Sequence, residues 1–280
     1  MMMKGNTATS FAGRIAVVTG ANKGIGYFIA LHLGLSGLFQ HILLGCRNEQ
    51  LGAQAVQSLH AQLPSTVHVS SSPLTIGDET SHAAFAESVE QRFGKVDVLV
   101  NNAGFAFKGS DPSPFEGQTK PTLDINYYGT VDFTEKMLPL LKKGQDPRLV
   151  NVASMSGRLR QLSPALQAQF ASPDLDMPQL HSLVKDFETS VADGTYQTKG
   201  WSNSNYGISK LALVAATKVW ARQHPDIAVN CCCPGYCKTD MTSQRGMRDP
   251  AEGARNAVIP ATMDKPPTGA FFADFEVAKW

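Results

Sequence analysis

The stretch that decides the fold is Thr19-Gly20-Ala21-Asn22-Lys23-Gly24-Ile25-Gly26. It follows a β-branched run at residues 14–19 and leads into a helical pattern that extends to about residue 38. Glycines permit a tight turn and let the backbone approach a pyrophosphate, while the N–H groups of the next helix point at that anion. A glycine-rich turn is often only a turn, but its position between a strand and a helix favours a dinucleotide site.

The alternation of strands and helices continues along the chain. Further buried strands are expected at 41–44, 67–70, 96–100, 148–152 and 227–231, with a seventh near 271–272. Such alternation is typical of a parallel sheet, and right-handed crossovers make it doubly wound. The predicted fold class is α/β, with a single doubly wound parallel sheet of the Rossmann type and helices on both faces.

The 280 residues are enough for one large α/β domain, which we expect over residues 11–280. Residues 1–10 are small and polar and are interpreted as a disordered lead-in. Residues 158–200 are polar and interrupt the strand–helix rhythm, so we expect an insertion there. Because the insertion leaves the fifth strand at its carboxyl end, it is expected to form one wall of a substrate pocket.

Composition and charge exclude several classes of function. The chain is 42% hydrophobic and 18% charged, with a net charge of +1. No basic stripe is present, which argues against nucleic acid as a partner. No apolar run is long enough for a transmembrane helix, and the first ten residues lack the apolar core of a secretory signal. We expect a cytoplasmic protein that does not associate with membranes.

The five cysteines indicate reduced thiols. Four of them lie between residues 231 and 237, and the odd total argues against a disulfide framework. Neighbouring residues of a strand point to opposite faces, so this run does not converge on one metal ion. We therefore predict no metal site.

The end of the second strand indicates which dinucleotide is bound. An NAD site usually places an acidic residue there, to bind the ribose 2′-OH. Here the sequence is Leu44-Gly45-Cys46-Arg47, and the Arg47 guanidinium suits a 2′-phosphate. Lys23 could reach the same phosphate, although either cation could also be an ordinary surface charge. The two cations and the missing acid favour NADP(H).

Tyr206 and Lys210 lie four residues apart, on one face of a predicted helix. A nearby ammonium favours the phenolate, so we expect Lys210 to lower the pKa of Tyr206 from its usual value of about 10. A phenol with such a pKa can serve in general acid–base catalysis. Alone the pair is weak evidence, since it is more often a packed ring beside a solvated charge.

Together these motifs resemble those of the short-chain dehydrogenase/reductases. They occur in family order: the glycine stretch, Asn101-Asn102-Ala103-Gly104, Asn126, Ser154, Tyr206 with Lys210, and Pro234-Gly235 followed by Thr239. More narrowly, the chain is similar to the NADPH-dependent carbonyl reductases, which share the long segment before the tyrosine and a terminal tryptophan, here Trp280. The resemblance implies reduction of ketones, aldehydes or quinones to alcohols.

The resemblance implies four catalytic residues. Tyr206 would give its proton to the carbonyl oxygen, and Ser154 would hydrogen-bond that oxygen. Lys210 would lower the pKa of Tyr206 and hold the nicotinamide ribose, while Asn126 would anchor a water chain leading to Lys210. The alternatives are a serine that caps a strand–loop junction and an asparagine that satisfies helix backbone.

The resemblance also implies a set of residues for NADPH. Where the family usually has an Asp that binds adenine, this chain has Thr75, which is expected to weaken cofactor affinity without changing the reaction. Cys237 is either a reactive thiol beside the nicotinamide or a packed side chain. The expected set is Gly20, Asn22, Lys23, Gly24, Ile25, Gly26, Arg47, Thr75, Asn102, Ala103, Gly104, Tyr206, Lys210, Pro234, Gly235, Cys237 and Thr239.

Substrate residues carry over less completely. Phe107, Lys108 and Gln118 match positions that bind glutathione-type ligands in the carbonyl reductases, although Lys108 could be a solvated loop cation. Tyr236 replaces a Trp that commonly lines the substrate cleft, and Ser154 and Tyr206 complete the set. Because Lys108 is the only cation indicated there, we expect a largely apolar carbonyl substrate.

The segment before the tyrosine helix bears on the oligomeric state, and two other functions are compatible with the motifs. Many short-chain enzymes form tetramers through the helix that carries the Tyr, and segment 158–200 would cover that helix, so we expect a monomer. One alternative function is a reductase dedicated to one metabolite, such as a pteridine, steroid or sugar ketone. The other is a non-catalytic NADP-sensing protein, although such sensors typically lose the Tyr or the Lys.

Overall fold

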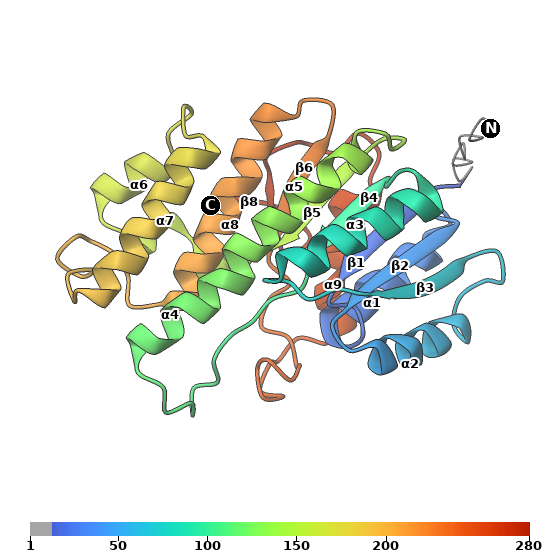
Figure 1. The fold of residues 1–280 in the computed structure, drawn as a ribbon, viewed down its shortest axis with the longest axis horizontal. Helices are drawn as coiled ribbons and strands as arrows, with labels where there is room; N and C mark the ends of the chain where they lie inside the picture. The colour runs from blue at the N-terminus through green and yellow to red at the C-terminus, as the bar shows by residue number, and fades with distance from the viewer. Residues whose placement is uncertain (1–12) are drawn as a thin grey trace, which may run out of the picture.

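The buried run Ile15–Thr19 forms strand β1, with β2 and β4 paired to it in parallel on either side. The computed structural model describes residues 13–280, so the lead-in expected at 1–10 lies outside the described residues. The sheet has eight strands in the order β3-β2-β1-β4-β5-β6-β7-β8 (Figure 1). The strands are β1, β2 (His41–Cys46), β3 (His68–Pro73), β4 (Val98–Asn101), β5 (Arg148–Val152), β6 (Ala228–Cys232), β7 (Phe271–Ala273) and β8 (Glu276–Ala278).

Every pairing is parallel except that of β7 with β8, which form an antiparallel edge. The predicted α/β fold class is confirmed, and each of the seven expected strands is present. The order reverses between β1 and β4, and this switch point is where open α/β sheets bind ligands.

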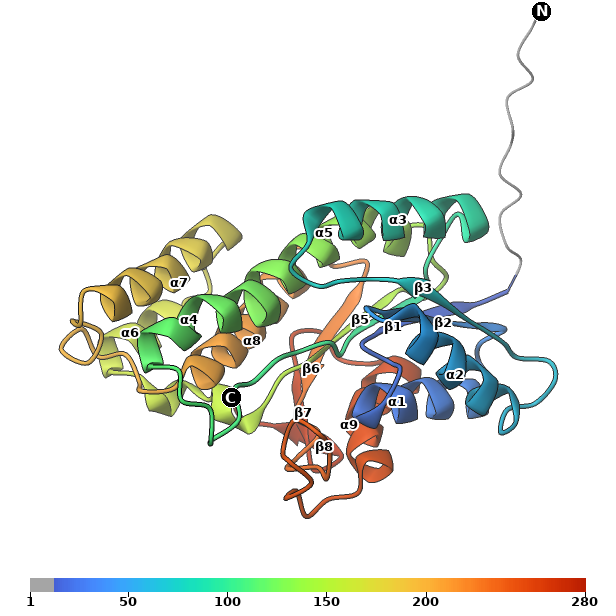
Figure 2. The same ribbon diagram turned by 60° about the horizontal axis from the view of Figure 1, so that its bottom comes forward.

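Helices cover both faces of the sheet (Figure 2). One layer contains α1, α2 and α9, whose apolar residues pack on one side of β1 and β2; the other contains α3, α5 and α8. The α-helices are α1 (Gly24–Leu35), α2 (Glu49–His60), α3 (Glu79–Phe93), α4 (Phe115–Leu123), α5 (Thr130–Leu141), α6 (Pro164–Phe170), α7 (Met177–Ala192), α8 (Asn205–Gln223) and α9 (Pro250–Thr262).

Segment 158–200 folds into α6 and α7, which lie beyond the sheet beside α4 and α8 (Figure 1). A capping box between Asp176 and Gln179 starts α7. The apolar side of this helix, which includes Leu180, Val184 and Phe187, is fully buried in the core that also contains α8. The insertion therefore covers part of the helix that carries Tyr206.

Two helical features lie outside the predicted pattern. A π-helical segment, η1 (Asp124–Gly129), separates α4 from α5. Helix α9 was not predicted, although Asp249 caps it and Pro250 occupies its first turn. An N-cap residue followed by proline is a recognisable signal in the sequence for the start of a helix.

The described cysteines are buried and free. Cys231 and Cys233 pack in one apolar cluster and Cys232 packs in another, as the alternation of a strand requires. Within residues 13–280, no three His, Cys, Asp or Glu side chains gather as a metal-binding group. No helix in this range combines the length and apolarity needed to cross a membrane.

Candidate active site

A cleft of about 580 Å³ opens where β1, β4 and β5 end. It is lined by the glycine stretch, by the segments that follow β4 and β5, by the first turns of α8 and by the loop after β6. It therefore unites motifs that are far apart in the sequence. The predicted site residues that line it are Gly20, Asn22, Lys23, Gly24, Ile25, Gly26, Arg47, Asn102, Ala103, Gly104, Tyr206, Lys210, Pro234 and Thr239.

The glycine stretch forms a close-fitting turn. Gly20 and Gly24 have φ values of +64° and +58°, a region that side chains disfavour. A Cβ at Gly26 would lie 2.4 Å from Nδ2 of Asn102, which donates hydrogen bonds to the carbonyls of Thr19 and Gly20. Asn102 thus ties the turn to the end of β4.

The start of α1 leaves N–H donors available to an anion. Lys23 is its N-cap residue and makes no side-chain capping hydrogen bond. The first N–H groups of a helix lack intrahelical partners, and together with the helix dipole they favour a phosphate. The cleft size, the bare backbone of the turn and these donors fit a dinucleotide pyrophosphate.

The two cations predicted to bind the 2′-phosphate differ in the structure. Arg47 is exposed and lines the cleft, and it forms no ion pair with any residue in 13–280. Lys23 also lines the cleft, but its Nζ lies 2.7 Å from a carboxylate oxygen of Asp240, in the loop after β6. Arg47 is therefore the freer donor for a phosphate.

The part of the cleft beside the end of β3 is apolar. Leu74 and Ile76 line the cleft, whereas Thr75 between them does not. The Thr75 N–H donates to Ser81, at the start of α3, and its carbonyl accepts from Asp78. The predicted adenine contact from Thr75 stays a prediction, and its two neighbours are the residues that sequence reasoning missed.

Tyr206 and Lys210 face the cleft from α8, with the lysine Nζ 5.7 Å from the centre of the tyrosine ring. Burial raises the pKa of Tyr206 to about 12, opposed in part by a hydrogen bond to Ser154. The expected lowering of this pKa is therefore wrong. Burial also lowers the pKa of Lys210 to about 8, and its ammonium donates to the Val152 carbonyl at 2.8 Å.

Ser154 and Asn126 lie next to this pair without lining the cleft. The Ser154 hydroxyl accepts from the N–H of Ser156, at the 3₁₀ turn η2 (Met155–Gly157), and hydrogen-bonds Tyr206. The Asn126 amide exchanges hydrogen bonds with the Phe105 backbone and donates to Ser209. The serine therefore caps a strand–loop junction, as in its alternative interpretation, whereas Asn126 satisfies loop backbone and not helix backbone. The catalytic roles of both residues stay predictions.

The loop after β6 closes one side of the cleft. Pro234 and Thr239 line it, while Gly235 and Cys237 do not. Cys237 is 1% exposed, its thiol hydrogen-bonds the Pro234 carbonyl, and burial raises its pKa to about 11. These observations favour the packed side chain over the reactive thiol.

Apart from Tyr206, the predicted substrate residues lie around the cleft rather than in it. Phe107 packs edge-on against Phe105, which does line the cleft, and Lys108 is exposed. Gln118 is engaged with the Ser113 carbonyl, so its amide faces its own loop. Tyr236 is 58% exposed on the loop after β6.

Other residues of the cleft were not found from the sequence. Helical segments contribute Phe28, Ile125 and Pro250. Loops and strand ends contribute Phe105, Val152, Ala153, Lys238, Asp240, Met241 and Gln244. Val152 and Ala153 carried a usable signal, because they immediately precede Ser154 at the end of a predicted strand. The loop residues have no local pattern that marks them.

Comparison with known proteins places the chain among short-chain enzymes. The sequence model described as short chain dehydrogenase matches residues 14–166 and 189–249. The gap between the two matched parts, residues 167–188, covers the end of α6 and most of α7, so the middle of the insertion is outside the matched family pattern.

Individual relatives and solved structures agree with the family match. Carbonyl reductase (NADPH) 1 of Homo sapiens is 37% identical over 279 residues, covering 95% of this chain and 98% of its own. The rabbit protein of the same name, from Oryctolagus cuniculus, is 36% identical over 280 residues with the same coverage. Salutaridine reductase from Papaver somniferum matches the fold with a TM-score of 0.83 at 30% identity, covering 92% of this chain and 99% of its own.

Proposed function

Because the chain belongs to the short-chain dehydrogenase family, we propose that it is an NADPH-dependent carbonyl reductase. The observation that carries this proposal is the convergence of Tyr206, Lys210 and the glycine turn on one cleft. The relatives named carbonyl reductase (NADPH) 1, which align over 95% of the chain, support the choice of cofactor and reaction.

Residues of the cleft would hold the cofactor at two ends. The glycine turn and the first N–H groups of α1 would bind the pyrophosphate, and Arg47 would bind the 2′-phosphate. When bound, NADPH supplies the hydride that reduces the carbonyl carbon. Lys23 would also bind the 2′-phosphate, once its ammonium leaves the carboxylate of Asp240.

The raised pKa of Tyr206 suits reduction. With a pKa of about 12 the phenol keeps its proton at neutral pH, so it begins the reaction as an acid. Tyr206 donates this proton to the carbonyl oxygen, and the Ser154 hydroxyl donates a hydrogen bond to the same oxygen. Lys210 has a pKa of about 8, so its ammonium is charged at pH 7. Because this pKa is close to neutral pH, Lys210 can also release a proton and return it toward Tyr206.

The proposed substrate is a largely apolar ketone, aldehyde or quinone. Exposed apolar side chains gather on the loop after β6, where Tyr236, Met241 and Met247 are 58%, 42% and 96% exposed. Met241 also lines the cleft. Glutathione-type ligands are a second substrate class that rests on Lys108, which is exposed beyond Phe105 and Phe107.

A monomeric state and a cytoplasmic location complete the proposal. The monomer is supported by the packing of α7 and its buried residues beside α8. The location is supported by the free state of all five cysteines. Sedimentation at micromolar concentration tests the first, and a tetramer mass would contradict it.

A substrate screen with NADPH and NADH in parallel tests the function. Menadione, isatin and simple aldehydes should be reduced with NADPH, and turnover with NADH should be much lower. Turnover with only a pteridine, steroid or sugar ketone would favour a dedicated reductase. NADPH binding without any reduction across the panel would favour a sensor.

A further inference from the structure

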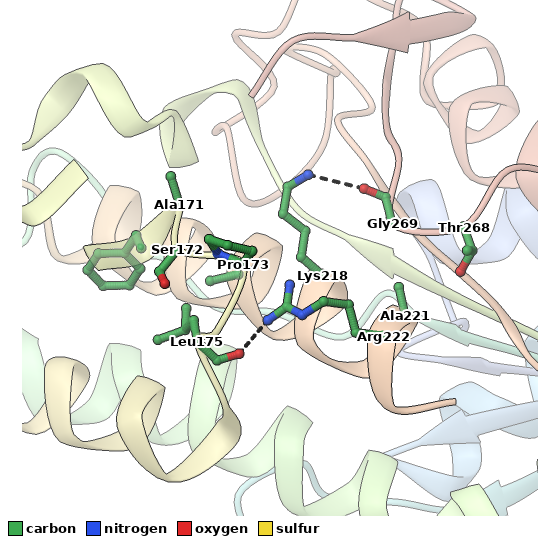
Figure 3. Close-up of a pocket in the computed structure, with 11 residues that line it drawn as sticks. Ala171, Ser172, Pro173, Leu175, Lys218, Ala221, Arg222, Thr268 and Gly269 are labelled. Carbon is green, nitrogen blue, oxygen red and sulfur yellow. Dashed lines mark hydrogen bonds between the residues drawn. The ribbon is translucent and has the colours of Figure 1, made fainter. Parts of the chain in front are cut away.

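A second pocket, with a lining separate from that of the cofactor cleft, lies along the C-terminal half of α8 (Figure 3). It has a volume of about 320 Å³ and three walls: the segment 170–175 between α6 and α7, the C-terminal half of α8, and residues 268–269 before β7. No residue lines both this pocket and the cofactor cleft. The catalytic proposal leaves the second pocket without a role.

Two cations of α8 reach into this pocket without acidic partners. Lys218 and Arg222 are four residues apart and therefore on one face of the helix. Each donates one hydrogen bond to a backbone carbonyl, Lys218 to Gly269 at 3.2 Å and Arg222 to Leu175. Figure 3 shows the two side chains directed to these opposite walls.

No carboxylate neutralises the pair. Within residues 13–280, neither cation forms an ion pair, and no Asp or Glu lines the pocket. Asp174 follows Pro173 in the chain but is not part of the lining. An ammonium has three N–H donors and a guanidinium has five, so both groups retain donors for a ligand.

Two hydroxyl groups add further donors. The Ser172 oxygen accepts from the N–H of Asp174, and the Thr268 oxygen accepts from the N–H of Val229. Neither hydroxyl donates to a protein group in the described chain, so each O–H is available. The polar lining therefore presents an excess of donors, which suits an acceptor-rich anion.

The remaining lining is apolar. In segment 170–175, the side chains of Phe170 and Leu175 are buried. Ala215 and Ala221 contribute small side chains from α8. Apolar walls with a few convergent polar groups are typical of sites for small organic ligands. An inorganic anion would leave these walls in contact with water.

We propose that this pocket binds a small carboxylic acid with an apolar body, its carboxylate held between Lys218 and Arg222. The aryl or alkyl part contacts the apolar walls, and the hydroxyls of Ser172 and Thr268 donate to the remaining carboxylate lone pairs. Because Lys218 is two to three helical turns beyond Lys210, binding there does not compete with the cofactor.

Calorimetric titration of the NADPH-saturated protein with 2-naphthoate tests the proposal. Saturable binding is expected, and the neutral isostere 2-naphthalenemethanol should bind about tenfold more weakly or worse. Lys218→Met and Arg222→Met should each weaken naphthoate binding by about tenfold or more. Lys142→Met, which removes an exposed cation outside the pocket, should leave the affinity unchanged.

Several results would contradict the proposal that this pocket binds a carboxylic acid. They are absence of naphthoate binding, equal binding of acid and alcohol, undiminished binding to Lys218→Met, or equal weakening by Lys142→Met. Inorganic phosphate that binds as tightly as naphthoate would show that the apolar walls play no part. If a Met variant unfolds, Thr268→Val and Ser172→Ala provide the comparison, with about twofold to tenfold losses expected.

Discussion

Helix α8 carries two pairs of residues with the same four-residue spacing, Tyr206 with Lys210 and Lys218 with Arg222. The two pairs differ in how deeply their surroundings bury them. Tyr206 and Lys210 face the cofactor cleft, where Lys210 is 4% exposed and donates to the Val152 carbonyl. Lys218 and Arg222 lie three turns further along, beside an open pocket, and Arg222 is exposed. An interval of four residues places side chains together, but burial decides what their charges do.

The two ends of α8 differ in hydration. At the buried end, loss of hydration raises the pKa of Tyr206 and lowers the pKa of Lys210. At the open end, Lys218 and Arg222 each donate to a backbone carbonyl and form no ion pair within residues 13–280. Variants at the two ends should therefore change different measured quantities.

The largest expected effect is on turnover. Tyr206→Phe removes the proton donor and should lower kcat by about 100-fold or more, while NADPH affinity is largely retained. Arg222→Met, at the other end of α8, is the matched control and should leave kcat unchanged. Steady-state kinetics and a separate NADPH titration measure both. A Tyr206→Phe enzyme with normal kcat would contradict the assigned role.

Loss of the Arg47 cation at the cofactor cleft should weaken NADPH binding, whereas loss of a cation at the second pocket should not. Arg47→Ala should raise the KM for NADPH by about tenfold and leave the KM for NADH nearly unchanged, because only NADPH carries the 2′-phosphate. The control, Arg222→Ala, should alter neither constant. Equal loss of both cofactors in Arg47→Ala would show that Arg47 acts on the fold instead of the phosphate.

Lys210 should lower the stability of the protein at neutral pH. Its pKa falls from 10.5 in the unfolded chain to about 8 in the folded protein. Below pH 8 the folded state carries a buried charge, so Lys210→Met should raise the free energy of unfolding by about 1–2 kcal/mol at pH 7. The lost hydrogen bond to Val152 offsets part of the gain.

This gain should depend on pH with a definite sign. Between pH 8 and 10.5 the unfolded wild-type chain binds more protons at Lys210 than the folded protein does, so wild-type stability rises relative to the variant. Urea unfolding of both proteins at pH 7 and pH 9.5 measures the difference. A gain of the same size at both pH values would show that burial of the charge is not its cause.

The smallest effect is expected at Cys237. Its pKa of about 11 leaves almost no thiolate at pH 7, so iodoacetamide should label the folded protein slowly with or without NADPH. The urea-unfolded protein is the reference for full reactivity. Rapid labelling that NADPH blocks would show instead that Cys237 is a reactive thiol beside the cofactor.

Sequence patterns predicted much of this molecule because they depend on near neighbours. The alternating strands and the glycine turn follow from residues only a few positions apart. The resemblance to the short-chain dehydrogenase/reductases then predicted most of the residues that line the cleft. Helix α9 had a start signal as well, in Asp249 and Pro250, which the prediction did not use.

Other features depend on segments that are distant in the chain. Lys23 meets Asp240 across 217 positions, and no local pattern marks that pair. The direction of the Tyr206 pKa shift follows from burial among strand ends and loops, which spacing on a helix cannot reveal. The second pocket exists only because segment 170–175 and residues 268–269 meet on α8. Local periodicity thus specifies the elements, whereas desolvation and charge pairing arise when the elements pack together.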